Sequence, residues 1–194
     1  MFYEFYIFFK CQIYKNGMGK TKIGIDCSIN STSVCIIEEG KKPIFYIIVP
    51  KMTKKMNEVN YGRICYFTYD KIEKDVTSNT YLISKQISQI ITNYIAKTKD
   101  IEVNMEDISL GSKGRSIIDL SILSGSIRCM LMDMGIKPNM IPITTWKKSM
   151  IANAFADKET IVESGRMLDQ DLYDQVKDVK KDDIFDSMFI ALYD

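Results

Sequence analysis

The chain has 194 residues, of which 46% are hydrophobic and 26% are charged, a composition typical of one globular domain with a full apolar core. Lysine plus arginine (26) nearly balances aspartate plus glutamate (25), so any nucleic-acid binding must rely on local basic patches. The sequence has no histidine, which excludes Ser-His-Asp and Cys-His catalysis and His-ligated zinc, and its five cysteines lack Cys-x-x-Cys spacing. These cysteines indicate a reducing compartment, so we expect a cytoplasmic protein.

Residues 1–21 are expected to form an N-terminal extension, and 22–194 the folded domain. The aromatic run at 2–9 is too short to span a bilayer, and no signal-peptide pattern follows it, so we expect no membrane association. Met18 stands just before the first predicted strand and is an alternative start of translation, in which case residues 1–17 are an upstream extension. The other reading is that residues 1–17 form a genuine edge strand, and both readings stay open.

Three strands are predicted at 22–28, 32–38 and 43–49, where β-branched and aromatic residues are enriched. Two short turns join them, which implies an antiparallel meander. Asp26 lies at the end of the first strand. A lone aspartate there commonly caps a turn by bonding its own backbone; the alternative is a metal ligand, if other carboxylates converge on the same place.

A second acid follows from the next elements. Segment 50–76 is polar and irregular, and its basic and aromatic residues can bind nucleic acid or form an ordinary surface loop. Isoleucines at helical spacing predict an amphipathic helix over 78–99, followed by a strand at 101–107 that carries Glu106. Because a helix crossover returns the chain parallel to a neighbouring strand, Asp26 and Glu106 should lie side by side.

The loop 108–115 combines glycines with the basic residues Lys113 and Arg115. Its glycines could cradle phosphate, although the spacing is not that of a P-loop. A long helix is predicted over 116–134. Gly125 lies in its middle, where glycine lowers helix propensity by about 1 kcal/mol relative to alanine, and this favours a close helix contact at that point.

A fifth short strand is predicted at 140–143, and a helix follows it. Thr144 is the expected N-cap of that helix, and the paired Lys147 and Lys148 would make a phosphate-facing corner. A further charged helix is predicted over 157–168.

The last predicted helix, 180–192, carries Asp182, Asp183 and Asp186 near its start. Spacings of three and four residues place these carboxylates on one face. Acids in a first turn are favoured by the helix dipole, yet like charges on one face repel one another. The structural and the functional interpretations of this helix both stay open on its own evidence.

Together, three separate acidic sites at two strand ends and one helix start are typical of proteins that hold two hard divalent cations. Mg²⁺ prefers a few carboxylates and keeps its waters for substrate phosphates. Two such ions can activate a water and stabilise the leaving oxygen in phosphodiester hydrolysis. This chemistry requires no histidine.

The order of elements is that of a ribonuclease H-like fold, and the sequence resembles the RuvC family of Holliday junction resolvases, particularly divergent phage or viral members. The resemblance runs from about residue 22 to the C-terminus, without the 50–76 insert. It rests on the following short motifs: Ile23-Gly24-Ile25-Asp26 with Ser28, Val103-Asn104-Met105-Glu106, Leu120, Leu123 and Gly125, Ile143-Thr144-Thr145-Trp146-Lys147-Lys148, Ala156-Asp157-Lys158, and Asp183-Ile184-Phe185-Asp186-Ser187. It implies an α/β fold with a mixed five-stranded sheet, three antiparallel strands and then parallel ones, flanked by helices.

The resemblance also implies a site and a substrate. By this similarity the acidic ligands of two Mg²⁺ ions, with Mn²⁺ as a substitute, are Asp26, Glu106, Asp183 and Asp186. Substrate-binding residues are expected to be Lys147, Lys148 and Lys158, together with Lys113 and Arg115. The family resolves four-way DNA junctions as a homodimer, so branched DNA and a second copy are the expected partners, without a small-molecule cofactor. A viral protein would act in the host cytoplasm or a viral factory.

Some positions depart from the family pattern and some alternatives stay open. Cys27-Ser28 follows the first acid where bacterial members commonly have glycine, and 149–156 replaces a glycine-containing run, which puts cleavage-sequence preference in question. Asp182 could replace Asp183 as a ligand, and Asp107 is a weaker neighbour of Glu106. Other ribonuclease H-like nucleases, acting on flaps or RNA-DNA hybrids, and a non-catalytic branched-DNA-binding protein are the alternative functions. Actin-like ATPases begin similarly but need a second duplicated domain.

Overall fold

The structure is a computed structural model that describes residues 19–51, 60–98, 100–108, 114–176 and 181–194. Its strands are β1 (Thr21–Asp26), β2 (Thr32–Glu38), β3 (Ile44–Pro50), β4 (Asn60–Tyr61), β5 (Ile64–Tyr69), β6 (Ile101–Glu106) and β7 (Asn139–Ile141). Its helices are α2 (Val76–Ile95), α3 (Arg115–Asp133), α4 (Ile143–Ile151), α5 (Lys158–Leu168), α6 (Gln170–Gln175) and α7 (Lys181–Leu192). Lys113 and positions 1–18 of the expected extension lie outside the described residues.

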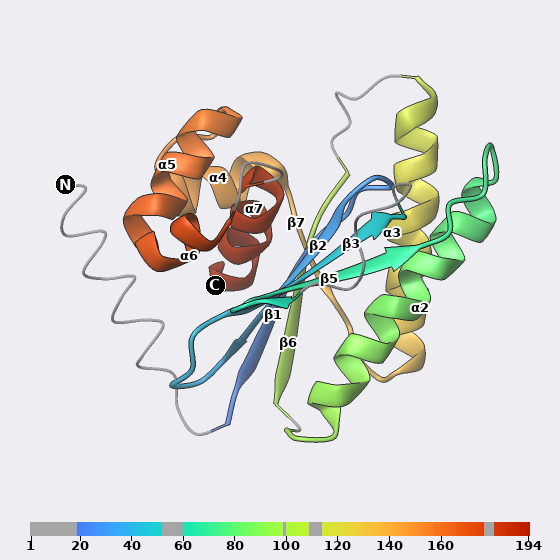
Figure 1. Cartoon of the computed structure of the whole chain (residues 1–194), viewed down its shortest axis with the longest axis horizontal. Coiled ribbons are helices and arrows are strands. Elements are labelled where there is room, and N and C mark those ends of the chain that lie inside the picture. Colours follow the sequence, from blue (N-terminus) through green and yellow to red (C-terminus); the bar gives the residue numbers. More distant parts are fainter. Residues whose placement is uncertain (1–18, 52–59, 99, 109–113, 177–180) are drawn as a thin grey trace.

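All described strands form one mixed sheet in the order β4-β5-β3-β2-β1-β6-β7 (Figure 1). As predicted, β1, β2 and β3 form an antiparallel meander, and α2 returns the chain to β6, which pairs parallel with β1. In that pairing Ile25 lies opposite Met105. The next residue of each strand, Asp26 and Glu106, therefore ends two neighbouring strands at the same edge of the sheet.

The described part of the sheet has seven strands rather than the expected five. The two extra strands, β4 and β5, come from segment 50–76, which the sequence analysis treated as irregular. β5 pairs parallel with β3, from Phe45 opposite Ile64 to Pro50 opposite Tyr69. The sequence Ile-Cys-Tyr-Phe-Thr-Tyr of β5 is rich in β-branched and aromatic residues, which suit a strand, and Gly62 turns the chain from β4 into β5 with a φ of 57°.

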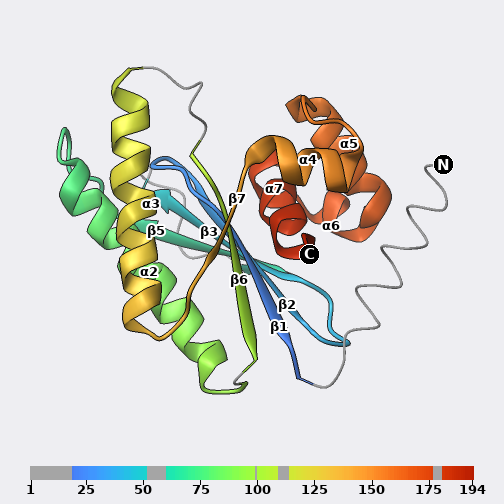
Figure 2. The same ribbon diagram turned by 180° about the vertical axis from the view of Figure 1, so that it is seen from behind.

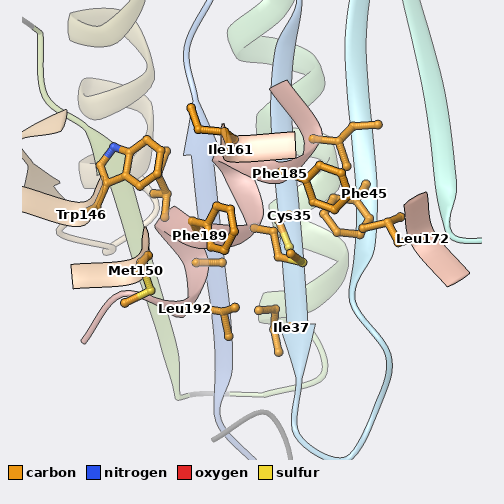
Figure 3. Close-up of a cluster of buried hydrophobic side chains, with 14 of the residues drawn as sticks. Cys35, Ile37, Phe45, Trp146, Met150, Ile161, Leu172, Phe185, Phe189 and Leu192 are labelled. Atoms are coloured by element: carbon orange, nitrogen blue, oxygen red, sulfur yellow. The ribbon is translucent and has the colours of Figure 1, made fainter. Parts of the chain in front are cut away.

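Helices cover both faces of the sheet, so the molecule has three layers and two cores. Figures 1 and 2 show α2 and α3 on one face and α4 to α7 on the other. In the core beneath α4 to α7, Phe185 and Phe189 of α7 pack near Cys35 and Phe45 of the sheet, with Trp146 of α4 beside them (Figure 3). These apolar contacts bury α7 against β2 and β3, next to the strands that end in Asp26 and Glu106.

α7 approaches the sheet most closely over Gly24 of β1. A Cβ at Gly24 would lie 2.1 Å from the carbonyl oxygen of Ser187 and 2.4 Å from the amide nitrogen of Ala191, so only glycine fits here. Nearby, the buried hydroxyls of Ser33 and Ser187 lie 2.8 Å apart in a hydrogen bond. Asn104 of β6 donates through Nδ2 to the Ile190 carbonyl at 3.0 Å. These contacts set the position of α7 along β1 and β6.

Two local expectations were wrong. α4 begins one residue before Thr144, at Ile143, and its N-cap is Pro142, whose φ of −58° leads directly from β7 into the helix. At Gly125 a Cβ would meet no atom within 4 Å among the described residues, so the expected close helix contact is not found within the chain. No helix in the described ranges is long and apolar enough to cross a membrane.

We expect Gly24→Ala to lower the free energy of unfolding by about 2 kcal/mol or more. The added methyl group would collide with two backbone atoms of α7, which cannot move aside as the end of a flexible side chain can. Gly125→Ala is the matched control: within a single copy of the chain its methyl group finds open space, so it should raise the stability of the monomer by up to about 1 kcal/mol when measured at protein concentrations low enough to keep the chain monomeric. Urea unfolding of both variants checks this. Equal stability of Gly24→Ala and the parent would contradict the close approach of α7.

Candidate metal centre

Carboxylates from three separate elements gather at the edge of the sheet where β1 and β6 end. Burial is the first cause that raises the pKa of Asp26 well above its usual range, and the charge of Asp186 is the second. Further contributions come from the charges of Glu106, Asp183 and Asp182. This convergence is the one predicted from two strand ends and the first turns of the last helix.

The hydrogen bonds of the β1–β2 turn bear on the two interpretations of Asp26. The Thr32 hydroxyl donates to the Ser28 carbonyl at 2.7 Å, the Ser28 amide donates to Thr32 Oγ1 at 3.3 Å, and the Asn30 amide donates to Ser28 Oγ at 3.4 Å. Side chains within the turn therefore close it, and the Asp26 carboxylate is left to face the other acids.

Asp186 is the second acid of the cluster whose pKa is strongly raised. Burial, followed by the charge of Glu106, raises the pKa of Asp186 to about 8, although the charge of Lys147 opposes the shift. Its Oδ1 atom is buried and has no hydrogen-bond partner among the residues that the structure describes. A buried acceptor without a donor is costly, so this oxygen is suited to a cation or another donor that binds at the site.

Glu106 has a donor that the sequence analysis did not identify. The indole Nε1 of Trp146 donates to Glu106 Oε2 at 3.0 Å. Burial raises the pKa of Glu106, and the Trp146 hydrogen bond and the charge of Lys147 oppose this. Trp146 is fully buried and stacks on Phe189 at 6.3 Å between ring centroids. A buried indole usually finds an acceptor. This tryptophan was therefore the sequence feature that could have indicated a hydrogen bond of this kind.

The remaining acids differ in their surroundings. Asp182 forms an ion pair with Lys158, whereas Asp183 is half-buried and acts on Asp26 through its charge. Asp107 is exposed, and its Oδ1 accepts a hydrogen bond from the Ile108 amide at 2.9 Å. Asp107 thus shapes the end of β6, away from the cluster of Asp26, Glu106, Asp183 and Asp186.

Two of the predicted basic residues reach the cluster. Lys147 is half-buried; its Nζ donates to the Ala156 carbonyl at 2.8 Å and lies 5.6 Å from the centroid of the Trp146 ring. Lys158 reaches the cluster through its pairing with Asp182. Lys148 is exposed on α4.

Arg115 lies in a different place. It is exposed at the start of α3 and lines a cavity of about 480 Å³. Cys27 and Ser28, the residues that follow Asp26, line the same cavity, with Lys71 and Lys74 from the segment before α2. Arg115 therefore lies beside the β1–β2 turn that follows Asp26, while Lys113, the other predicted residue of this loop, lies outside the described residues.

The oxygen ligands of the cluster suit a hard cation, but they do not lie close enough together to surround one. Among the described residues, no three histidine, cysteine, aspartate or glutamate side chains are close enough together to hold an ion between them. The acids are all oxygen donors, which favours Mg²⁺ or a similar ion over zinc, and the unpaired Oδ1 of Asp186 supplies a free ligand atom.

We expect the metal-free protein to lose stability between about pH 4 and pH 8. The pKa of Asp186 is raised from 3.8 to about 8, so the stabilising contribution of its neutral form is complete below the lower value and is lost as the pH rises through the higher one. Asp186→Asn removes this titration. Its free energy of unfolding in EDTA should therefore exceed that of the parent by on the order of 1 kcal/mol or more at pH 8.5, and by less at pH 6.

Urea unfolding at the two pH values provides the measurement. Asp100→Asn is the control, because Asp100 is an exposed acid just before β6, at the opposite end of that strand. The same pH dependence in Asp186→Asn and in the parent would contradict a buried, repelled carboxylate at position 186.

Comparisons with known proteins agree with this architecture. No protein-family model matches the chain, and no curated protein sequence matches it. Solved structures do match. RuvC of Thermus thermophilus superposes with a TM-score of 0.57 at 11% identity, over 89% of this chain and 91% of that one. The same protein in complex with a Holliday junction substrate gives a TM-score of 0.60, with the same identity and coverage.

The yeast mitochondrial Holliday junction resolvase Ydc2 superposes with a TM-score of 0.54 at 16% identity, over 95% of this chain and 81% of that one. Identities this low establish the fold alone. The expected fold class is confirmed: the chain has a mixed sheet flanked by helices, an α/β fold of the ribonuclease H-like type that it shares with RuvC.

Proposed function

We propose that the protein is a metal-dependent endonuclease that resolves four-way (Holliday) junctions and other branched DNA by paired phosphodiester hydrolysis. The observation that carries this proposal is the convergence of Asp26, Glu106 and Asp186 at one edge of the sheet. Burial raises the pKa values of all three, and the charges of neighbouring acids raise those of Asp26 and Asp186 further. Carboxylates whose pKa values are strongly shifted and that lie close together are typical of catalytic sites. The shared fold supports the same proposal, because the RuvC structure with the higher TM-score contains a Holliday junction substrate.

The proposed ligands of two Mg²⁺ ions, for which Mn²⁺ could substitute, are Asp26, Glu106, Asp183 and Asp186. When bound, such ions supply an activated water and stabilise the leaving oxygen of a phosphodiester. The carboxylates must lose their protons to bind a cation, so binding releases protons and strengthens as the pH rises. Trp146 holds one oxygen of Glu106 in place and so limits the orientations that this carboxylate can adopt.

The lysines beside the acids would hold the DNA backbone. Lys147 is oriented by the Ala156 carbonyl and the Trp146 ring, and it brings a positive charge to the edge of the acid cluster. Lys158 is 82% exposed while it pairs with Asp182, so its ammonium group can turn to a phosphate. We propose phosphate contacts for these two residues and for the exposed Lys148, because such contacts position the backbone without reading its sequence. Lys113 and Arg115 are proposed to contact a second part of the branched substrate.

The outer face of α3 supports the proposed homodimer. Five positions follow one another at spacings of four, three, four and three residues, which is the spacing of a helix-helix seam: Ile118, Ile122, Gly125, Cys129 and Met132. Ile118, Ile122 and Met132 are 59, 41 and 56% exposed. This stripe has no apolar cover in the described part of the chain.

A second copy of the chain is the occupant that we propose for this stripe. One apolar stripe on one helix is self-complementary about a two-fold axis, which is the commonest symmetry of soluble oligomers. The small residues Gly125 and Cys129 lie inside the stripe and allow two helices to approach closely. Gly125 has no close neighbour within the described chain, so a partner helix would account for it. Two sites related by symmetry would also suit two symmetric cuts.

We expect the purified protein to nick a synthetic four-way junction in Mg²⁺ and to be inactive in EDTA. Asp26→Asn should lower the cleavage rate at least about 100-fold, since it removes a charged ligand, while Asp100→Asn should cleave like the parent. Parallel reactions with a flap, an RNA-DNA hybrid and a plain duplex measure substrate choice. Full activity of Asp26→Asn would reject the mechanism, preference for flaps or hybrids would favour another nuclease function, and binding of junctions without cleavage would favour a non-catalytic role.

We expect Ile122→Glu to convert a dimer into monomers, because a charge in the centre of an apolar seam cannot be buried without a partner. Sedimentation equilibrium, with and without junction DNA, measures the molecular mass. Tyr81→Glu is the control, since Tyr81 is 62% exposed on α2 and lies outside the stripe. A parent protein that is monomeric both free and on DNA would exclude this interface.

A further inference from the structure

Phe155 is the most exposed large apolar side chain in the described part of the molecule, at 86%. It lies between α4 and α5, in a turn that the metal centre does not use. Exposed apolar residues are common on protein surfaces, but an almost fully exposed phenylalanine in a tight turn is not explained by packing. Its surroundings indicate what it could contact.

The turn that carries Phe155 is held on both sides. Ala152 ends α4 in the left-handed conformation with a φ of 58°. The Phe155 amide donates to Asn153 Oδ1 at 3.0 Å, and the next residue, Ala156, is buried and accepts a hydrogen bond from Lys147 through its carbonyl. A conformation that alanine rarely adopts, supported by several bonds, is typical of functional loops. The ring is thus presented to solvent by a rigid support, so little conformational freedom would be lost when it binds.

Lysines outnumber acids around the turn, which favours an anionic partner. Lys147 bonds the turn directly, and Lys158 begins the helix that follows it. Asp157 is the N-cap of that helix, and Glu159 lies in its first turn. Lys148, Asn153 and Lys158 are all exposed, so the ring stands alone among polar side chains rather than within an apolar patch, as a protein interface of any size would require. A partner that offers a flat apolar face together with negative charge is a nucleotide, whose base stacks on the aromatic ring while its phosphates meet the lysines.

We propose that Phe155 stacks on a nucleobase that is unpaired or splayed at the branch point of the DNA. This inference rests on the proposed function and deepens it, because it assigns a selectivity role. In a continuous duplex both faces of each base are covered by its neighbours. A base becomes available to an aromatic side chain only where stacking is interrupted, as at a branch. Phe155 therefore favours branched DNA over duplex, while the lysines beside it bind both.

The test uses the full chain in an Asp26→Asn background, so that binding is measured in Mg²⁺ without cutting. The probes are a four-way junction that carries 2-aminopurine at one branch nucleotide at a time, and a duplex of the same sequence. We compare Phe155→Ala, Phe155→Trp and, as a control, Met167→Ala, which removes a side chain 55% exposed on α5. Anisotropy gives Kd, and 2-aminopurine emission reports stacking of the labelled base. Thermal unfolding confirms that the variants fold.

We expect Phe155→Ala to weaken junction binding about 10-fold, the lower part of the range for one base-aromatic stack, and to leave duplex binding within about twofold. It should also abolish the emission change at one or more branch positions. Phe155→Trp should retain both properties, and Met167→Ala should behave like the background protein. Equal losses on junction and duplex, or an unchanged emission signal in Phe155→Ala, would overturn the role of Phe155 while leaving the nuclease proposal intact. Failure of the background protein to bind any branched DNA would overturn both.

Discussion

The close contact of α7 with β1 is the constraint on which the rest of the structure depends. Gly24 leaves room for the backbone of α7 at Ser187 and Ala191, and the hydrogen bonds of Ser33 and Asn104 set the position of the helix along the sheet. Because α7 begins with acids and ends in apolar residues, this position also decides where its carboxylates lie. A helix displaced outward by one methyl group would move these acids away from the strand ends.

The acid cluster is unfavourable for folding, and the surroundings offset only part of that cost. The raised pKa values of Asp26, Glu106 and Asp186 mean that burial resists each charge, and that neighbouring acids also resist the charges of Asp26 and Asp186. The Trp146 indole and the Lys147 charge act in the opposite direction at Glu106, yet one oxygen of Asp186 has no donor among the described residues. Stability lost at a site that concentrates charge is a common consequence of function, and here it leaves the cluster in need of positive charge.

The three layers divide the proposed work. Strand ends and α7 carry the acids, the α4–α5 region carries lysines and Phe155 on the same side of the sheet, and α3 lies on the opposite face (Figure 2), with its apolar stripe exposed. The proposed chemistry and the proposed assembly would therefore use separate surfaces of one sheet. The same strands support both surfaces, since β1 and β6 contact α7 on one face and the helices of the second core on the other.

Local sequence determined the elements that periodicity and composition encode: five strands, four of the helices to within a few residues at each end, and the acids at their ends. The crossover rule was enough to place Asp26 beside Glu106, because handedness and parallel pairing leave few arrangements. Tertiary structure alone decided the pairing of β5 with β3, the indole bond to Glu106, the pairing of Lys158 with Asp182, and the absence of an internal contact at Gly125. The physical reason is that sequence patterns record preferences between near neighbours in the chain. Side-chain partners across the sheet are chosen instead by packing, which only the complete fold defines.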